Sequence, residues 1–272
     1  MWNVNRVIFL LLVVLATLTA QVVSAANEQP VYGALNNLHQ IRLLNTKAIT
    51  DFYMFIGLNA DTRYSRQIEE SKTKTERLVE ELVAFQDIPE FNAQTASVSK
   101  QWKKVSNLLT TNIRDVKTQG YSDNRLVSDL LNEGLVLNEL INNTYTNLQT
   151  LTDKKVNQWT DKSRAQSLLM RYIALQYSAR SAAFTGGFAM YDKPLDELVV
   201  EFKTAFSSIA DLNINTPEIQ KELNSVDTKW RFIEKSLINY NDDSVPYVVS
   251  VYADKIVNSL ENAATLYEKV GS

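Results

Sequence analysis

One stretch of the chain, residues 31–58, combines an apolar helical pattern with polar side chains that could hold a ligand. At about 100° per residue, Asn45 falls in the middle of the apolar face and Arg42 on its flank. Both need partners, because a buried polar group without one costs about 1–3 kcal/mol. A small anion would satisfy both side chains. An internal hydrogen bond, or a carboxylate from a neighbouring helix, is the alternative. The apolar face consists of Leu38, Ile41, Leu44, Ala48, Ile49, Phe52, Phe55 and Ile56.

Signatures of enzymes and metal sites are absent from the sequence. It contains no cysteine, a single histidine (His39), no Gly-rich phosphate loop and no G-x-S-x-G elbow. The acidic pairs, such as Glu69-Glu70 and Glu80-Glu81, are typical of solvated helix faces. The net charge is −3 and the basic residues are scattered, so no nucleic-acid footprint is present. We therefore expect neither enzymatic activity nor a cofactor, a metal or a nucleic-acid partner.

The N-terminal residues 1–25 have the features of a secretory signal peptide. Arg6 precedes an apolar run, and Val23-Ser24-Ala25 offers small residues for cleavage. We expect cleavage after Ala25 and a periplasmic or secreted mature chain. An uncleaved N-terminal membrane anchor is the alternative, because the uncharged stretch is nearly long enough to span a bilayer.

The chain also contains an internal repeat. Residues 89–102 read PEFNAQTASVSKQW, and residues 217–230 read PEIQKELNSVDTKW. The Pro-Glu, Ser-Val and Trp positions fall in one register, and apolar residues continue the match beyond the tryptophans. This pattern indicates a duplication. It predicts that Trp102 and Trp230 occupy equivalent, buried core positions.

The composition predicts an all-α fold. The 272 residues include only 7 Gly and 5 Pro, and Leu, Ala, Glu, Lys, Asn and Gln are common. We expect two tandem up-down four-helix bundles that form an elongated rod, a first module over residues 26–158 and a second over 159–272. One long bundle of interleaved helices is the alternative. No Gly or Pro occurs between Gly134 and Gly186, so the fourth and fifth helices could be continuous, with Gly186-Gly187 as the stop.

The opening of the first helix resembles a known family. Residues 36–47 read NNLHQIRLLNTK, which is similar to the N-x-A-G-x-Q-R-M-L-S-Q-R opening of PilJ-type domains. These are periplasmic modules of type IV pilus chemotaxis transducers and nitrate/nitrite sensors. Arg42, Leu44 and the basic Lys47 fall in place, whereas His39 replaces a glycine. The tryptophan helices resemble the family's later P-x-I…W segment, so the resemblance implies two tandem PilJ-type modules.

The resemblance also implies ligand-binding roles. In nitrate/nitrite sensors the arginine before Met-Leu contacts the anion across a dimer seam, a role that falls here on Arg42. Asn45 would assist, and Lys47, which lies away from Arg42 on the helical wheel, would face solvent or a partner subunit. In the second copy Gln166 stands at the position of that arginine, so this copy is a weaker site. Arg164 and Arg171 remain there, on one helix face, as further candidates.

The sequence therefore predicts a periplasmic sensory module. It would bind a small anion or metabolite, or a membrane-bound sensor or transducer, and it could form a homodimer. The competing hypothesis is a structural helical spacer or assembly protein of the cell envelope with no ligand. A cavity that contains Arg42 or Asn45 would favour the sensory module, and an intramolecular salt bridge of Arg42 would favour the spacer.

Overall fold

The computed structural model describes the fold of residues 4–86, 88–182, 193–240 and 244–270, and the side chains from residue 29 onward. The described residues form eight helices and no strand, which confirms the predicted all-α class. The helices are α1 (Val4–Gly57), α2 (Thr62–Ala84), α3 (Pro89–Gln119), α4 (Asn124–Thr152), α5 (Gln158–Ser181), α6 (Leu195–Ala210), α7 (Pro217–Ile238) and α8 (Pro246–Val270). Three of them, α3, α7 and α8, begin at a proline, a residue that is tolerated in the first helical turn.

The helices pack in two sets of four. Helices α1–α4, the first helical group, pack each on the next, and α4 also packs on α1; helices α5–α8, the second helical group, are connected in the same way. Each group has its own hydrophobic core. Leu43 of α1 belongs to the second core, and Leu175 and Ala179 of α5 belong to the first, so the groups share an apolar contact.

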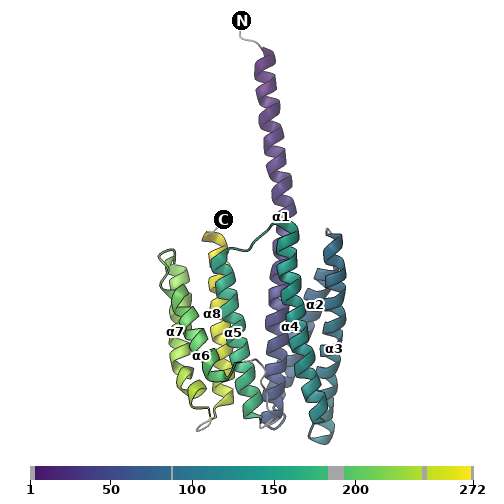
Figure 1. The fold of residues 1–272 in the computed structure, drawn as a ribbon, viewed down its shortest axis with the longest axis vertical. Helices are drawn as coiled ribbons and strands as arrows, with labels where there is room; N and C mark the ends of the chain where they lie inside the picture. The colour runs from purple at the N-terminus through teal and green to yellow at the C-terminus, as the bar shows by residue number, and fades with distance from the viewer. Residues whose placement is uncertain (1–3, 87, 183–192, 241–243, 271–272) are drawn as a thin grey trace.

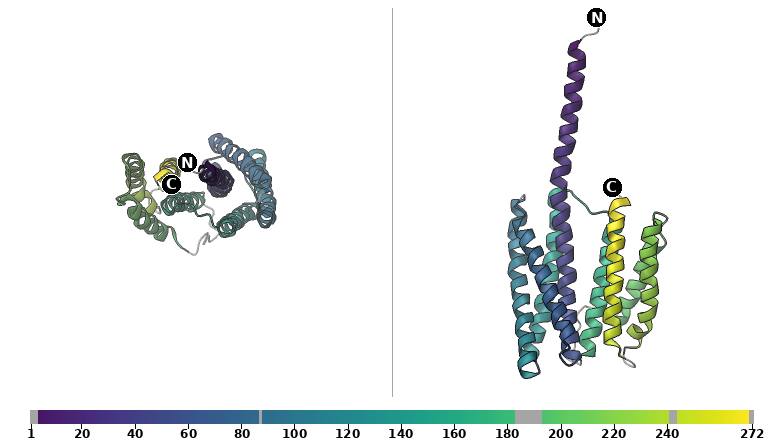
Figure 2. Two further views of the ribbon diagram at one scale, coloured as in Figure 1. Left: turned by 90° about the horizontal axis from the view of Figure 1, so that it is seen from above. Right: turned by 180° about the vertical axis from the view of Figure 1, so that it is seen from behind.

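The two groups lie side by side, with α1 packed against α5 between them (Figures 1 and 2). This arrangement differs from the elongated rod that we expected. The expectation of a continuous fourth and fifth helix is wrong, because Asp153 adopts a left-handed conformation (φ 51°) after α4. Asn157 then caps α5 by accepting a hydrogen bond from the backbone N–H of Trp159. Asp and Asn can break a helix in this way without Gly or Pro.

Helix α1 is the longest element, with 54 residues and Pro30 inside it. It continues well past the ends of the other helices toward the N-terminus (Figure 1). The signal peptide was expected at residues 1–25, whose side chains are not among those described. The expected helix stop at Gly186-Gly187 also lies outside the described residues. Among the residues that the structure describes, no helix is long and apolar enough to span a membrane.

The end of α3 gives a test of the helix boundaries. Gly120 follows α3 with φ 86°, and its N–H donates to the carbonyl of Val116. Replacing Gly120 with alanine should lower the free energy of unfolding by about 1 kcal/mol, because a Cβ is strained in this conformation. Gly33→Ala is the matched control, since Gly33 lies inside α1 with open space around it. It should stabilise the protein by about 0.5–1 kcal/mol. Urea denaturation measures the change in the free energy of unfolding for both variants. A change of the same sign in both would contradict the placing of Gly120 at the end of α3 and of Gly33 inside α1.

Candidate functional site

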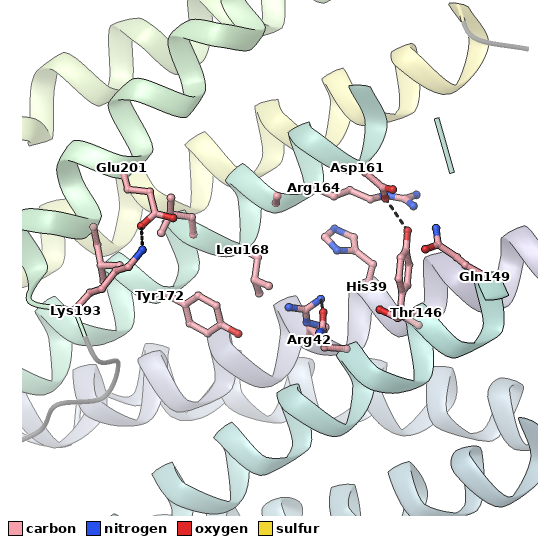
Figure 3. A pocket seen from close by; sticks show the side chains of 15 residues that line it. His39, Arg42, Thr146, Gln149, Asp161, Arg164, Leu168, Tyr172, Lys193 and Glu201 are labelled. Carbon is pink, nitrogen blue, oxygen red and sulfur yellow. Dashed lines mark hydrogen bonds and ion pairs between the residues drawn. The ribbon is translucent and has the colours of Figure 1, made fainter. Parts of the chain in front are cut away.

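A pocket of about 590 Å³ lies between the two helical groups and opens to solvent (Figure 3). Its walls come from α1 and α4 on one side and from α5, α6 and the residue Lys193 on the other. The side chains that line it are His39, Arg42, Asn142, Tyr145, Thr146, Gln149, Asp161, Arg164, Ala165, Leu168, Leu169, Tyr172, Lys193, Leu198 and Glu201. The packing of α1 against α5 thus brings Arg42 and Arg164, one candidate from each repeat, to the same pocket.

Arg42 is the lining cation whose charge is least compensated. Its side chain is half-buried, and one terminal nitrogen donates a 3.2 Å hydrogen bond to the amide oxygen of Asn142. The Nε atom of Arg42 is buried and has no hydrogen-bond partner. Within the described residues, no carboxylate forms an ion pair with this guanidinium. Arg42 therefore keeps an uncompensated charge at the pocket, and it has terminal N–H groups besides the one that meets Asn142.

The other basic side chains of the pocket have acidic partners. His39 Nε2 lies 2.9 Å from Glu261 Oε1, and the Lys193 ammonium lies 2.6 Å from Glu201 Oε2. The guanidinium of Arg164 donates to Glu268 at 2.7 Å and to Asn36 at 3.0 Å. Its own Nε is buried without a partner, but its charge is already balanced. The structure thus places Arg164 in the pocket as a paired group.

Besides Glu201, the carboxyl group of Asp161 also lines the pocket. Its Oδ1 accepts a 2.7 Å hydrogen bond from the hydroxyl of Tyr145. Burial raises the pKa of Asp161, although the Tyr145 hydrogen bond and the nearby Arg164 charge act in the opposite direction. Among the described residues, no cluster of three or more His, Cys, Asp or Glu side chains could hold a metal ion.

Asn45 does not line this pocket. It is fully buried in the first helical group, and its Nδ2 donates to the carbonyl of Gly134 and to the Asn138 side chain, both at 2.9 Å. Asn138 in turn donates to Thr46 at 2.9 Å. Because Gly134 has no side chain, α4 can approach α1 closely there; a Cβ would lie 2.2 Å from Ile49. Asn45 therefore forms internal hydrogen bonds, which was the alternative to a ligand in the sequence analysis.

Lys47 and Arg171 belong to a separate charged cluster on the seam between the groups. This seam cluster consists of Lys47 and Asp51 of α1, Arg171 of α5 and Asp254 of α8. The Lys47 ammonium lies 3.0 Å from each carboxylate, and Arg171 forms an ion pair with Asp254. Lys47 was expected to face solvent or a partner subunit, but α8 of the same chain supplies its partner. Lys47 meets α8 because the two groups pack side by side. A helical wheel of α1 alone cannot show this packing.

The pKa values of the two carboxyls in the seam cluster are shifted in opposite directions. Asp51 is 1% exposed, and burial raises its pKa to about 6 against the opposing effect of Lys47. Burial also acts to raise the pKa of Asp254, but the charges of Arg171 and Lys47 outweigh it and lower that pKa. At neutral pH the cluster therefore holds two positive and two negative groups in a largely buried seam.

Several lining residues were not identified from the sequence. They include Tyr145 on α4 and Asp161, Leu168, Leu169 and Tyr172 on α5. Their helical spacing shows that those of one helix share a face, but the same spacing is typical of an ordinary core or surface stripe. Only the packing of α5 beside α1 and opposite α4 makes them one site.

Comparison with known protein families, with characterised proteins and with solved structures found no match to this chain.

Proposed function

We propose that this protein is a ligand-binding helical module and that Arg42 holds a small anion in the pocket between the two groups. The observation that carries the proposal is the state of Arg42. It faces a solvent-open cavity with a buried, unpartnered Nε and without a carboxylate partner in the described structure. An exposed arginine without a partner would be ordinary, but a half-buried guanidinium that lines a cavity without a carboxylate can offer a guest the terminal N–H groups that do not meet Asn142.

The competing function, a structural spacer, would be favoured by a salt bridge of Arg42 within the chain. His39, Lys193, Arg164 and Arg171 all have such a partner. Among these five residues, Arg42 is the one without an acidic partner in the described structure. A structural spacer would have no need of an arginine that lacks such a partner at this position. The paired residues are consistent with a supporting role around the site.

We also propose that the two helical groups are copies of one PilJ-like four-helix module. The repeated tryptophans support this, because Trp102 and Trp230 are each 3% exposed and lie in the two cores. The stretches that carry the resemblance, in α1 and α5, lie side by side. One chain would then supply both sides of a seam that two subunits supply in the nitrate/nitrite sensors. A periplasmic location and a membrane-bound signalling partner belong to the same proposal.

The first test is a thermal-shift screen of small anions on the mature chain, followed by calorimetry. A ligand at 100 times its Kd should add about 2.7 kcal/mol of stability. Replacing Arg42 with glutamine should weaken binding by about tenfold to a hundredfold, because a hydrogen bond to a charged group contributes about 1.5–3 kcal/mol.

Arg125→Gln is the matched control for this variant. It removes an arginine from the exposed part of α4, where the side chain pairs with Asp129 and lines no part of the pocket. This variant should bind like the wild type. Wild-type affinity in Arg42→Gln would contradict the proposal. A stable protein that no small anion stabilises would favour the structural spacer.

A further inference from the structure

We infer that the ligand is an amphipathic organic monoanion, with its charged head at Arg42 and its apolar body along α5 and α6. The inference rests on the proposed function and names the class of ligand. It follows from how the pocket divides its chemistry between the two helical groups. The cation without an acidic partner in the described structure comes from the first group, as Arg42 beside Asn142. The leucines that line the pocket come from the second group, whose cations there, Arg164 and Lys193, are paired with carboxylates.

The apolar wall consists of Leu168, Leu169 and Tyr172 of α5 and Leu198 of α6. Leu169 and Tyr172 lie on one face of α5 and are half-buried, so part of their apolar surface meets water in the cavity. In Figure 3 the side chains of Leu168 and Tyr172 lie near the Arg42 guanidinium. A ligand body there would remove this surface from water, which is the main favourable term for apolar contact.

The charges of the pocket favour one negative charge on the ligand. Arg42 is the lining cation with no acidic partner in the described structure, whereas His39, Arg164 and Lys193 are paired. Two acidic side chains, Asp161 and Glu201, also line the cavity. A second negative charge on the ligand would meet these carboxyls without a free cation to offset the repulsion.

The size of the pocket argues against a bare inorganic anion. Its volume of about 590 Å³ lies within the range of roughly 300–1,000 Å³ that is typical of sites for drug-sized ligands. A triatomic or tetra-atomic anion at Arg42 would leave most of this space, and the apolar wall, in contact with water. A carboxylic acid with an aliphatic chain would fill both parts and would bridge the two helical groups.

The inference is tested by calorimetry on the full mature chain with nitrate, acetate, butanoate, hexanoate and octanoate. Affinity should rise by about fourfold for each methylene that the pocket buries, so hexanoate should bind much more tightly than acetate or nitrate. Hexanamide, which has a similar body without the charge, should bind at least tenfold more weakly than hexanoate.

Two variants separate the head from the body of the ligand. Arg42→Gln should weaken all the carboxylates by a similar factor. Leu169→Gln should weaken octanoate by about tenfold and leave acetate unchanged, because it removes apolar wall and not charge. Val136→Gln is the control for a surface apolar-to-amide change, since Val136 is 49% exposed on α4 and does not line the pocket.

The two proposals fail in different ways. If nitrate and acetate bind as tightly as octanoate and Leu169→Gln changes nothing, the amphipathic ligand is excluded while the Arg42 anion site stands. If hexanamide matches hexanoate, or if no anion binds the wild-type chain, the anion site and this inference are both wrong. A chain-length dependence that Leu169→Gln abolishes and Arg42→Gln preserves would support the inference.

Discussion

Replacing Trp230 with alanine is expected to lower the free energy of unfolding by about 3–5 kcal/mol. Trp230 is 3% exposed in the core of the second helical group. Its ring stacks on Phe202, with the ring centroids 4.3 Å apart and the planes at 27°. Removing it deletes a large apolar surface and this aromatic contact, and it leaves a cavity that helices α6 and α7 can fill only by moving.

Trp159 provides the matched control for this substitution. It is only half-buried, at the start of α5, and its described ring contact is with the Lys162 ammonium, 4.5 Å from the ring centroid. Trp159→Ala should therefore cost much less, about 1 kcal/mol. Urea denaturation followed by circular dichroism measures both variants. An unchanged midpoint for Trp230→Ala would mean that the apolar stripe of α7 does not form the core.

Trp102 extends the test to the proposed duplication. It is also 3% exposed, in the core of the first helical group. If the groups are copies of one module, Trp102→Ala should destabilise the protein about as much as Trp230→Ala. If the groups unfold separately, each variant should shift its own transition and leave the other in place.

The helices and their buried faces were predictable from the sequence, because helical periodicity reports which side of a helix is apolar. The prolines at 89, 217 and 246 begin helices, and both tryptophans are buried as expected. Periodicity does not report what covers an apolar face. The break between α4 and α5 depends on the backbone conformation of Asp153 and the cap by Asn157, and side-chain type alone does not require either.

The candidate site was predictable only in part, for the same reason. The flank position of Arg42 on its helix indicated a polar group in need of a partner, and the structure places it in a pocket. Asn45 has the same need, and its amide N–H groups meet the Gly134 carbonyl and Asn138 inside the core, while its Oδ1 is buried without a partner. Lys47 meets Asp254, a residue far along the chain. No single-helix argument distinguishes these outcomes, because each depends on which helix packs against α1.

The seam cluster leads to a prediction about pH. Asp51 is the most deeply buried carboxyl of the cluster, and burial raises its pKa from 3.8 to about 6. A raised pKa in the folded state means that the folded protein binds this proton more tightly than the unfolded chain does. The stability that protonated Asp51 contributes is thus fully present below pH 3.8 and is lost as the pH rises through 6. Since one pKa unit corresponds to about 1.4 kcal/mol, the loss is about 3 kcal/mol.

Asp51→Asn should remove this dependence, because an amide of nearly the same shape does not titrate in this range. Lys47 keeps an acidic partner in the variant through Asp254. The free energy of unfolding of Asp51→Asn minus that of the wild type should therefore rise by about 2.4 kcal/mol between pH 4 and pH 7, because the first part of the loss already falls below pH 4. Urea denaturation at a series of pH values measures this difference directly.

The comparison with the wild type is needed because other buried carboxyls act in the opposite direction. Burial acts to raise the pKa values of Asp254 and Glu261. Arg171 and Lys47 outweigh this effect at Asp254 and lower its pKa, and His39 does the same at Glu261. Their contributions are present above their usual pKa values and are lost as the pH falls through the lowered ones. Glu261 contributes equally to the variant and the wild type, so it cancels in the difference. Asp254 interacts with Asp51, but its lowered pKa lies below the compared range of pH 4 to pH 7. Asp129→Asn, which removes an exposed carboxyl from α4, should give a small difference at every pH. A difference for Asp51→Asn that is equally flat would show that Lys47 compensates the buried charge fully, and that the seam between the two groups is held without an electrostatic cost.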